Sequence, residues 1–225
     1  DKNAGTHKKI NATNNSISVN SIHGNENYDV TFVAEAKHKI DKAQAIITAN
    51  SLMTTYNGQN QTVSGFTATG LVGGEDILVL TDVTATGATG KNAGSYVNKA
   101  SGTDENYDLT FVDGALEIAK AKATITANSA NTTYNGQNQS VSGFIASGLV
   151  NGEDISVLSD VSASVSGKDA GTYVHQAKGT DENYELTFVD GPLDIGKAKA
   201  TATANSANTT YNGQNQSVSG FTATG

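Results

Sequence analysis

One stretch of the sequence occurs three times. It reads TTYNGQNQTVSGFTATG at residues 54–70 and returns with few changes at 132–148 and 209–225. The tyrosines of the three copies stand at positions 56, 134 and 211, so successive copies are 78 and 77 residues apart. Self-similarity at a nearly fixed spacing is the signature of tandem structural modules. It constrains the fold before any single motif does.

The spacing predicts four segments along the chain. A first complete repeat covers 42–119 and a second covers 120–196. Residues 197–225 form the N-terminal half of a third repeat, and residues 1–41 match the C-terminal half of a divergent one. The second repeat is one residue shorter than the first, next to a glycine, which indicates a surface turn.

The first, divergent copy departs from the others in two places. Within residues 7–27 it carries ten extra residues, a polar stretch suited to an extended loop or a longer hairpin. At 34–39, AEAKHK replaces the Asp-Gly turn of the later copies, so the turn signal of the last hairpin is missing from this copy. A strand is still expected at 27–33, where NYDVTFV matches both complete repeats.

Each repeat is predicted to consist of short β-strands. Apolar and polar residues alternate in runs separated by Gly and Asn, most clearly in YELTF at 184–188. No run has a helical period, and frequent Gly, Thr and Val oppose helix. Six or seven strands in fewer than 80 residues predict an all-β chain of small antiparallel, Ig-like β-sandwiches placed end to end. A β-grasp-like sheet with one short helical turn is the alternative.

The junction between repeats contains no spacer. Residues 116–125 read LEIAKAKATI, without Gly or Pro, so the last strand of one repeat runs directly into the first strand of the next. This pattern predicts a stiff connection, unlike the flexible coil of a Gly/Ser linker. Because each repeat has few large apolar residues, we expect neighbouring repeats to stabilise one another.

Composition excludes several classes of partner. The net charge is −8, which disfavours nucleic acid and anionic membrane surfaces. Cysteine is absent, which excludes disulfides and thiolate metal sites. No apolar run reaches the roughly 18 residues of a membrane span.

Five motifs follow one another in each repeat. In the second repeat they are KAKATITAN at 120–128, TYNG at 133–136, SGFIASGLVNGED at 142–154, KDAGTY at 168–173 and NYELTFVDGPLDI at 183–195. In this order they resemble the MBG/YDG-type repeats of large bacterial secreted and cell-surface proteins, including filamentous-haemagglutinin-like adhesins. The resemblance covers both complete repeats and both fragments. It implies an extracellular β-rich repeat that extends or displays an adhesive protein, and it brings no catalytic residues with it.

The sequence offers no convincing catalytic residues. The four histidines share no position of the repeat, and we expect them on the surface or in loops: His7, His23, His38 and His175. A nucleophile needs an oriented base, and no G-x-S-x-G element occurs. The glycine-rich runs GLVGG and GLVNG lack the Lys-Ser/Thr of a phosphate-binding loop and are interpreted as turns.

Acidic pairs recur at two positions of the repeat. They are Glu75-Asp76, Asp104-Glu105, Glu153-Asp154 and Asp181-Glu182. Ca²⁺ takes six to eight oxygen ligands, often at alternating loop positions, but no D-x-D-x-D-G spacing is present. We therefore predict solvated loops and charged strand ends that discourage edge pairing. No cofactor is expected, and Ca²⁺ is the alternative.

Two pairs of residues have the side-chain chemistry of an intramolecular crosslink. Lys91 with Asn92, or Thr133 with Gln137, could form an intramolecular isopeptide or ester crosslink, provided that the partners are buried beside an acid.

The repeated Tyr56, Tyr134 and Tyr211 are either core anchors or exposed aromatics that stack on a glycan. Core packing is the prediction, because small domains need every large side chain.

These observations favour a structural function. We predict a stalk or spacer segment of a bacterial surface adhesin that is not an enzyme. The alternative is a module that binds a glycan or a host protein, and a third hypothesis is an accessory region of a carbohydrate-active enzyme. Since incomplete sandwiches expose unpaired edges, 197–225 is also expected to exchange strands with a neighbouring repeat or another molecule.

Overall fold

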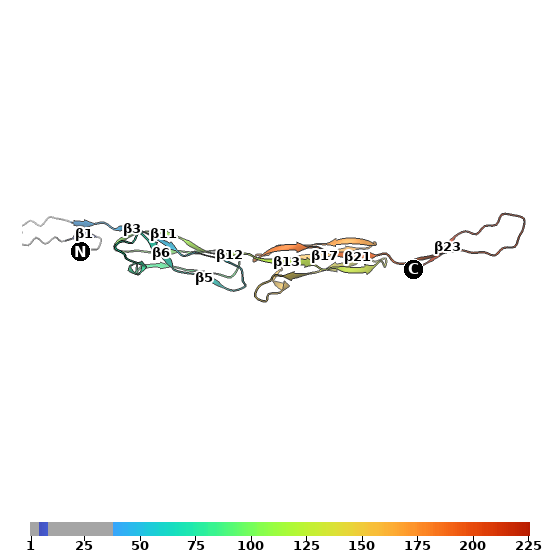
Figure 1. Cartoon of the computed structure of the whole chain (residues 1–225), viewed down its shortest axis with the longest axis horizontal. Helices are drawn as coiled ribbons and strands as arrows, with labels where there is room; N and C mark the ends of the chain where they lie inside the picture. Colours follow the sequence, from blue (N-terminus) through green and yellow to red (C-terminus); the bar gives the residue numbers. More distant parts are fainter. Residues whose placement is uncertain (1–4, 9–37) are drawn as a thin grey trace, which may run out of the picture. The chain divides into compact units, whose positions relative to one another are not determined.

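The computed structural model describes residues 5–8 and 38–225. These residues form β-strands and two single turns of 3-10 helix, and no α-helix occurs among them (Figure 1). The prediction of an all-β chain of tandem repeats is therefore confirmed. The strand predicted at 27–33 lies outside the described residues. So do the insertion within 7–27 and the altered turn at 34–39, except for residues 7–8 and 38–39.

The strands of the N-terminal segment and the first repeat are β1 (Gly5–Lys8), β2 (His38–Ile40), β3 (Ala43–Ala49), β4 (Leu52–Thr55), β5 (Gln61–Val63), β6 (Phe66–Thr69), β7 (Val83–Ala85), β8 (Ala88–Gly90), β9 (Gly94–Asn98), β10 (Ala100–Gly102), β11 (Tyr107–Val112) and β12 (Gly114–Ala119). The 3-10 turn η3 (Ile77–Val79) lies between β6 and β7.

The strands of the second repeat and the C-terminal fragment are β13 (Ala121–Ala127), β14 (Ala130–Thr133), β15 (Gln139–Ser142), β16 (Phe144–Ser147), β17 (Ser162–Gly167), β18 (Gly171–His175), β19 (Ala177–Lys178), β20 (Tyr184–Val189), β21 (Gly191–Gly196), β22 (Thr201–Ala204) and β23 (Phe221–Thr224). The 3-10 turn η4 (Ile155–Val157) lies between β16 and β17.

Both complete repeats use the same pairings. In the first, β3 is the middle strand between β11 and β6, and these three strands lie side by side in Figure 1. In the second, β13 takes that place between β20 and β16. A further three-stranded sheet has the order β4-β12-β9 in the first repeat and β14-β21-β18 in the second.

The sheets are mixed, which differs from the antiparallel pairing that the sequence predicts. The first strand of each repeat runs parallel to a late one: β3 to β11, and β13 to β20. The pair β14 and β21 is parallel as well. Alternation in a sequence reports which face of a strand is buried, but not the direction of its partner. The β-grasp alternative shares a short helical turn with the structure, but each repeat contains several small sheets.

The core is thin and lies along the middle strands. In β3, Ala45, Ile47 and Ala49 are buried, while the residues between them are exposed. The same alternation in β13 buries Ala123 and Ile125. Leucine and isoleucine from the strands β12 and β21 complete this interior. With so few large side chains, each repeat depends strongly on every aromatic residue that it buries.

The chain divides into two compact units that do not follow the repeat boundaries. Unit 1 comprises Asp1–Thr54 and Asn60–Ile118, and unit 2 comprises Thr55–Gln59 and Ala119–Gly225. The predicted segments are contiguous, whereas unit 2 includes six residues that belong by sequence to the first repeat, namely Thr55–Gln59 and Ala119. The chain therefore passes between the units three times.

The C-terminal fragment forms a two-stranded antiparallel sheet of β22 and β23. Ala204 pairs with Phe221, as Ala127 pairs with Phe144 in the second repeat. All residues of 196–225 are exposed. An isolated pair of strands is marginally stable in water.

Candidate functional site

The acidic turn after β16 positions a glutamate beside a buried tyrosine. Glu153 follows the GLVN run, where its amide donates to the carbonyl of Val150 (3.0 Å). Tyr184, at the start of β20, is buried, and its hydroxyl donates to Oε2 of Glu153 (2.6 Å). The same hydroxyl accepts the amide of Val150 (2.9 Å). The turn and the strand are thus fixed to each other through one phenol.

Tyr56 completes this arrangement from the segment Thr55–Gln59. Its hydroxyl donates to Oε1 of Glu153 (2.6 Å), and its amide donates to the carbonyl of Ala119 (2.8 Å). The ring meets that of Tyr184 edge to face, with the centroids 5.5 Å apart and the planes at 79°. Only 5% of Tyr56 is exposed. We call Tyr56, Glu153 and Tyr184 the tyrosine clamp, in which one carboxylate accepts two phenols.

The turn after Tyr56 is shaped by its own side chains. The Oδ1 atom of Asn57 accepts the amide of Gln59 (2.9 Å), and Gly58 has a φ of 75°, which favours glycine. A Cβ atom at Gly58 would lie 3.1 Å from Cβ of Asn151 and 3.3 Å from Oε1 of Glu153. The Tyr-Asn-Gly turn therefore packs closely on the acidic turn of the second repeat.

The clamp perturbs the acidity of both phenols. Burial and the hydrogen bond to Glu153 raise the pKa of Tyr184 to about 12. Burial and the bond to the same carboxylate raise the pKa of Tyr56 further. A tyrosinate could not donate and would repel the carboxylate, so both phenols stay neutral donors at physiological pH. This chemistry suits a structural contact and offers no general base.

Unit 1 contains an equivalent glutamate that accepts a buried tyrosine hydroxyl. The hydroxyl of Tyr107 donates to Oε2 of Glu75 (2.6 Å) and accepts the amide of Val72 (2.9 Å), as in the second repeat. The bond to Glu75 raises the pKa of Tyr107. Glu75 is exposed, whereas Glu153 is half-buried beneath Tyr56.

The second tyrosine turn has the shape of the first. The amide of Tyr134 donates to the carbonyl of Gly196 (2.8 Å), and Oδ1 of Asn135 accepts the amide of Gln137 (2.9 Å). Gly136 has a φ of 76°, but no atom lies within 4 Å of the place that its Cβ would take.

The third turn repeats this geometry: Oδ1 of Asn212 accepts the amide of Gln214 (3.0 Å), and Gly213 has a φ of 75°.

The three tyrosines therefore have different environments in spite of their identical local sequence. The predicted burial is confirmed for Tyr56. It is wrong for Tyr134 and Tyr211, which are 39% and 90% exposed. What buries Tyr56 is the acidic turn of the following repeat, about 97 residues further along the chain.

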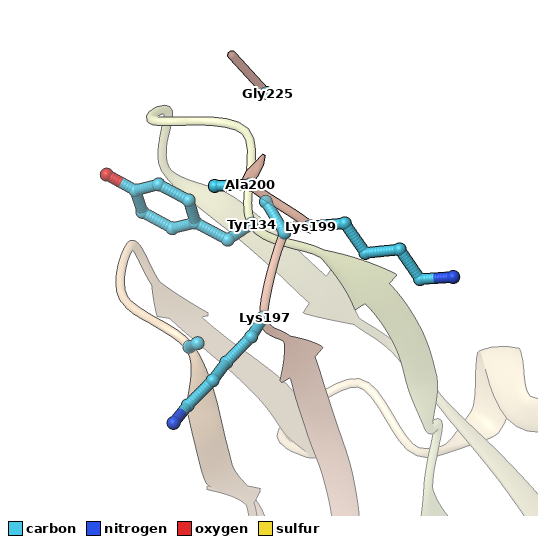
Figure 2. A pocket seen from close by; sticks show the side chains of 7 residues that line it. Tyr134, Lys197, Lys199, Ala200 and Gly225 are labelled. Atoms are coloured by element: carbon cyan, nitrogen blue, oxygen red, sulfur yellow. The ribbon is translucent and has the colours of Figure 1, made fainter. Parts of the chain in front are cut away.

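An open pocket of about 440 Å³ adjoins Tyr134. Its lining consists of Tyr134, Ala170, Lys197, Ala198, Lys199, Ala200 and Gly225. In Figure 2 the hydroxyl of Tyr134 and the amines of Lys197 and Lys199 point in three different directions. The pocket thus presents a tyrosine ring and small side chains rather than a convergent set of polar groups.

The aspartates of the acidic pairs shape the backbone. Asp76 and Asp154 cap the 3-10 turns by accepting the amides of Leu78 and Ser156. Hydrogen bonds from the side chain and then the amide of Ser156 lower the pKa of Asp154.

Asp104 accepts the amides of Asn106 and Tyr107, and Asp181 accepts those of Asn183 and Tyr184. The prediction of solvated loops therefore missed that these aspartates accept backbone amides and fix the turns before β11 and β20. In the described part of the chain, no three His, Cys, Asp or Glu side chains gather as metal ligands.

His175 corrects the prediction of surface histidines. It is fully buried at the end of β18, with Nδ1 2.7 Å from the carbonyl of Asn128. A carbonyl only accepts, so Nδ1 carries the hydrogen. Asn98, the equivalent residue, is also buried, and its amide nitrogen donates to the carbonyl of Asn50 (2.9 Å). The position therefore takes a polar side chain that satisfies a buried backbone group.

Two other sequence hypotheses can be placed on the structure. Lys91, Thr133 and Gln137 are exposed, so the burial that a crosslink requires is not met. The runs GLVGG and GLVNG form turns before the 3-10 turns, as interpreted from sequence. Among the described residues, no helix is long and apolar enough to cross a membrane.

Comparison with known proteins identifies the repeats. The profile of the YGX-type MBG domain matches residues 45–117 and 123–194. The chain belongs to the YGX-type MBG domain family. Both MBG domains contain the hydrogen bond from tyrosine to glutamate, Tyr107 to Glu75 and Tyr184 to Glu153. The resemblance recognised from the five motifs is confirmed. None of the curated proteins compared with the chain matches it.

One solved structure with remote similarity is the Bacteroides ovatus mixed-linkage glucan utilization locus protein SGBP-B in complex with a mixed-linkage heptasaccharide. The identity is 10% and the TM-score 0.19, over 71% of this chain and 49% of that one. The present chain thus spans about half of the length of that protein.

Proposed function

We propose that these MBG repeats are a stalk segment of a bacterial cell-surface adhesin, which holds an adhesive region away from the cell by reach and stiffness. The family membership and the near-identity of the repeats support this proposal. A dedicated binding site would be expected to make one repeat differ from the others. The proposal assigns the chain no catalytic role.

The tyrosine clamp is the observation that carries the proposal. Thr55–Gln59 belongs by sequence to the first repeat but packs within unit 2. Flexible stalks connect domains through single linkers, whereas here the chain passes between its compact units three times. Two of these crossings flank the Tyr56 turn, which is held by the bonds to Glu153 and Ala119. Such an anchored loop should restrict independent motion of consecutive repeats.

A distance measurement between spin labels tests this stiffness. Val97 and Val174 occupy equivalent places in β9 and β18, are 61% and 58% exposed, and can be changed to cysteine in a chain that has none. We expect a narrow distance distribution that broadens with Tyr56→Ala. The matched control Tyr211→Ala should leave it narrow. A broad distribution in the unmodified repeats would contradict a stiff stalk.

The exposed hairpin of β22 and β23 supports self-association by strand exchange with a neighbouring repeat or another molecule. Its two strands lack the third, parallel strand that β20 provides to β13. Hydrogen exchange of the β22 amides should slow as protein concentration rises. Exchange that is independent of concentration would argue against strand pairing between molecules.

The alternative function, binding of a glycan or a host protein, is favoured by the exposed Tyr134 beside its open pocket. Sugars stack on exposed aromatic rings, so a glycan that binds here should lose affinity with Tyr134→Ala while the melting temperature stays close to its original value. A glycan array without hits would count against it.

A further inference from the structure

The two complete repeats differ most in one short region. It reads VTATGATGKNAGSYVNKAS at residues 83–101 and VSASVSGKDAGTYVHQAK at 161–178. The second copy is one residue shorter, and at its end HQAK replaces NKAS. Because a dedicated binding site would make one repeat differ from the other, this region is where such a site is expected.

In the first repeat, the extra residue interrupts a strand. Gly87, with a φ of 73°, separates β7 from β8, and these strands belong to two different two-stranded sheets. The amide of Gly87 donates to Oδ1 of Asn98 (2.9 Å). The hydroxyl of Thr86 accepts the amide of Lys99 (3.1 Å) and donates to the carbonyl of Gly87 (3.2 Å). The polar groups of this turn therefore already have partners.

In the second repeat, the strand is continuous. The single strand β17 pairs with β15 on one side and β19 on the other. Ser162 lies opposite Lys178 in the register, and Ser164 shares the face of Ser162 because alternate residues of a strand do so. Among the described residues, the two hydroxyls and the amine of Lys178 have no hydrogen-bond or ion-pair partner. They are available to a ligand.

A polar groove of about 250 Å³ lies at this place. Its lining consists of Ser162, Ala163, Ser164, Val174, Gln176 and Lys178. All of these residues except Ala163 are exposed. Nε2 of Gln176 donates to Oδ2 of Asp190 (3.1 Å), which restrains the amide group at one end of the groove. We call these six residues the serine groove.

We propose that the serine groove binds one ring of a neutral saccharide. Sugar hydroxyls both donate and accept hydrogen bonds, which matches serine hydroxyls and a glutamine amide, and Lys178 adds further donors. Val174, 58% exposed, offers apolar surface to the C–H face of a ring. The volume is below that of most small-molecule pockets, so it suits a single ring better than a longer segment.

The charges of the groove favour a neutral sugar over an acidic one. Lys178 is the only charged residue of the lining, while Asp190 lies against Gln176. The chain as a whole carries a net charge of −8. A sugar carboxylate or sulfate would therefore meet one attractive charge in a repulsive surrounding, whereas a neutral ring has no such cost.

The groove does not owe its exposure to the ends of the chain. Val97, the residue equivalent to Val174, is 61% exposed although a complete repeat follows it. Val174 is 58% exposed although a complete repeat precedes it. A neighbouring repeat on either side thus leaves this face open.

This inference rests on the glycan-binding alternative and gives it a second place on the chain, away from Tyr134. It is independent of the stalk proposal, because a stiff spacer can carry a weak binding site. The groove is open and has no aromatic ring, so we expect an affinity in the millimolar range.

Titration of the isotope-labelled full chain by NMR tests the proposal. The probes are the methyl glycosides of glucose, galactose, mannose and N-acetylglucosamine, with methyl glucuronide as the acidic comparison. We expect at least one neutral glycoside to shift the amide signals of 162–164 and 176–178 in a saturable way. The equivalent signals of 84–86 and 99–101 should stay in place.

Two variants assign the binding to the groove. Lys178→Ser introduces the residue that the first repeat has at this position, and Ser164→Ala removes one hydroxyl from an exposed site. Lys178→Ser should weaken binding about tenfold, the effect of losing a hydrogen bond to a charged group. Lys168→Ser, the matched control at an exposed lysine outside the groove, should bind like the unmodified chain, and so should Tyr134→Ala.

Four results would overturn the proposal. They are the absence of shifts with every neutral glycoside, equal shifts in both repeats, unchanged affinity in Lys178→Ser and Ser164→Ala, and binding of methyl glucuronide alone. A loss of binding in Tyr134→Ala with no loss in the groove variants would place the glycan at Tyr134 instead. None of these results bears on the stiffness that the spin labels measure.

Discussion

At the scale of single residues, the central feature is one carboxylate shared by two phenols. Glu153 accepts Tyr56 through one oxygen and Tyr184 through the other. The two rings cover the glutamate and contact each other. The carboxylate of Glu153 is thereby half-buried in unit 2, while the equivalent Glu75 in unit 1 stays exposed.

Removal of the Tyr56 ring should destabilise unit 2 strongly. Truncation of a buried aromatic side chain to alanine costs about 3 to 5 kcal/mol, because apolar contacts are lost and a cavity remains. The same change at the exposed Tyr211 should alter the free energy of unfolding by no more than about 0.5 kcal/mol. Denaturant unfolding of both variants measures the difference, and equal effects would show that the clamp contributes little.

Stability should fall in alkaline solution. The pKa of Tyr184 is raised from 10.0 to about 12 in the folded chain. Its phenol therefore ionises at a lower pH in the unfolded chain than in the folded one. The stabilisation is complete below pH 10 and is lost as pH rises toward 12. Thermal melts between pH 8 and 12 should show this decline, and Tyr184→Phe should make it shallower. A decline of the same steepness in that variant would assign the effect to other groups.

At the scale of elements, the Tyr-Asn-Gly turn is one shape with two environments. Gly58 and Gly136 have φ values of 75° and 76°, but only Gly58 faces atoms of another turn closely. The turn forms from local bonds, and the docking then depends on whether an acidic turn lies against it.

The two glycines therefore provide a matched pair of substitutions. Gly58→Ala and Gly136→Ala should cost the same backbone strain, of about 1 to 2 kcal/mol for a left-handed residue. Gly58→Ala should cost more, since its Cβ would lie 3.1 Å from Asn151. Chemical denaturation of both variants gives the difference, and equal losses would mean that the docked turns can shift apart freely.

At the scale of the whole molecule, two compact units are connected by three crossings of the chain. The net charge is −8, and several of the acidic side chains accept hydrogen bonds from backbone amides or phenols. Stability of this molecule is thus expected to come from short strands, caps and the clamp.

Calcium removal should leave this stability unchanged. Asp76 and Asp154 cap 3-10 turns, while Glu153 accepts two phenols, so these oxygens already have partners. Melting temperatures in millimolar Ca²⁺ and in a chelator should agree. A clear rise with Ca²⁺ would identify a metal site and revive the alternative considered from sequence.

The sequence by itself determined the all-β class, the 78-residue spacing and the MBG family. The all-β class and the family follow from local alternation, turn residues and motifs within each repeat, and the spacing follows from comparison of the copies. The recurrence of Glu75 with Tyr107 and of Glu153 with Tyr184 was also visible, though nothing local showed that the residues touch. Parallel pairing of β13 with β20 was invisible, because alternation carries no strand direction.

Only the tertiary structure decided which tyrosine is buried. Tyr56, Tyr134 and Tyr211 follow the same residues and precede the same Asn-Gly turn, yet their exposed fractions are 5%, 39% and 90%. The difference arises from a partner about 97 residues away, so no window of sequence around the tyrosine contains it. His175 is similar: its burial depends on the carbonyl of Asn128, a neighbour that only the folded sheets supply.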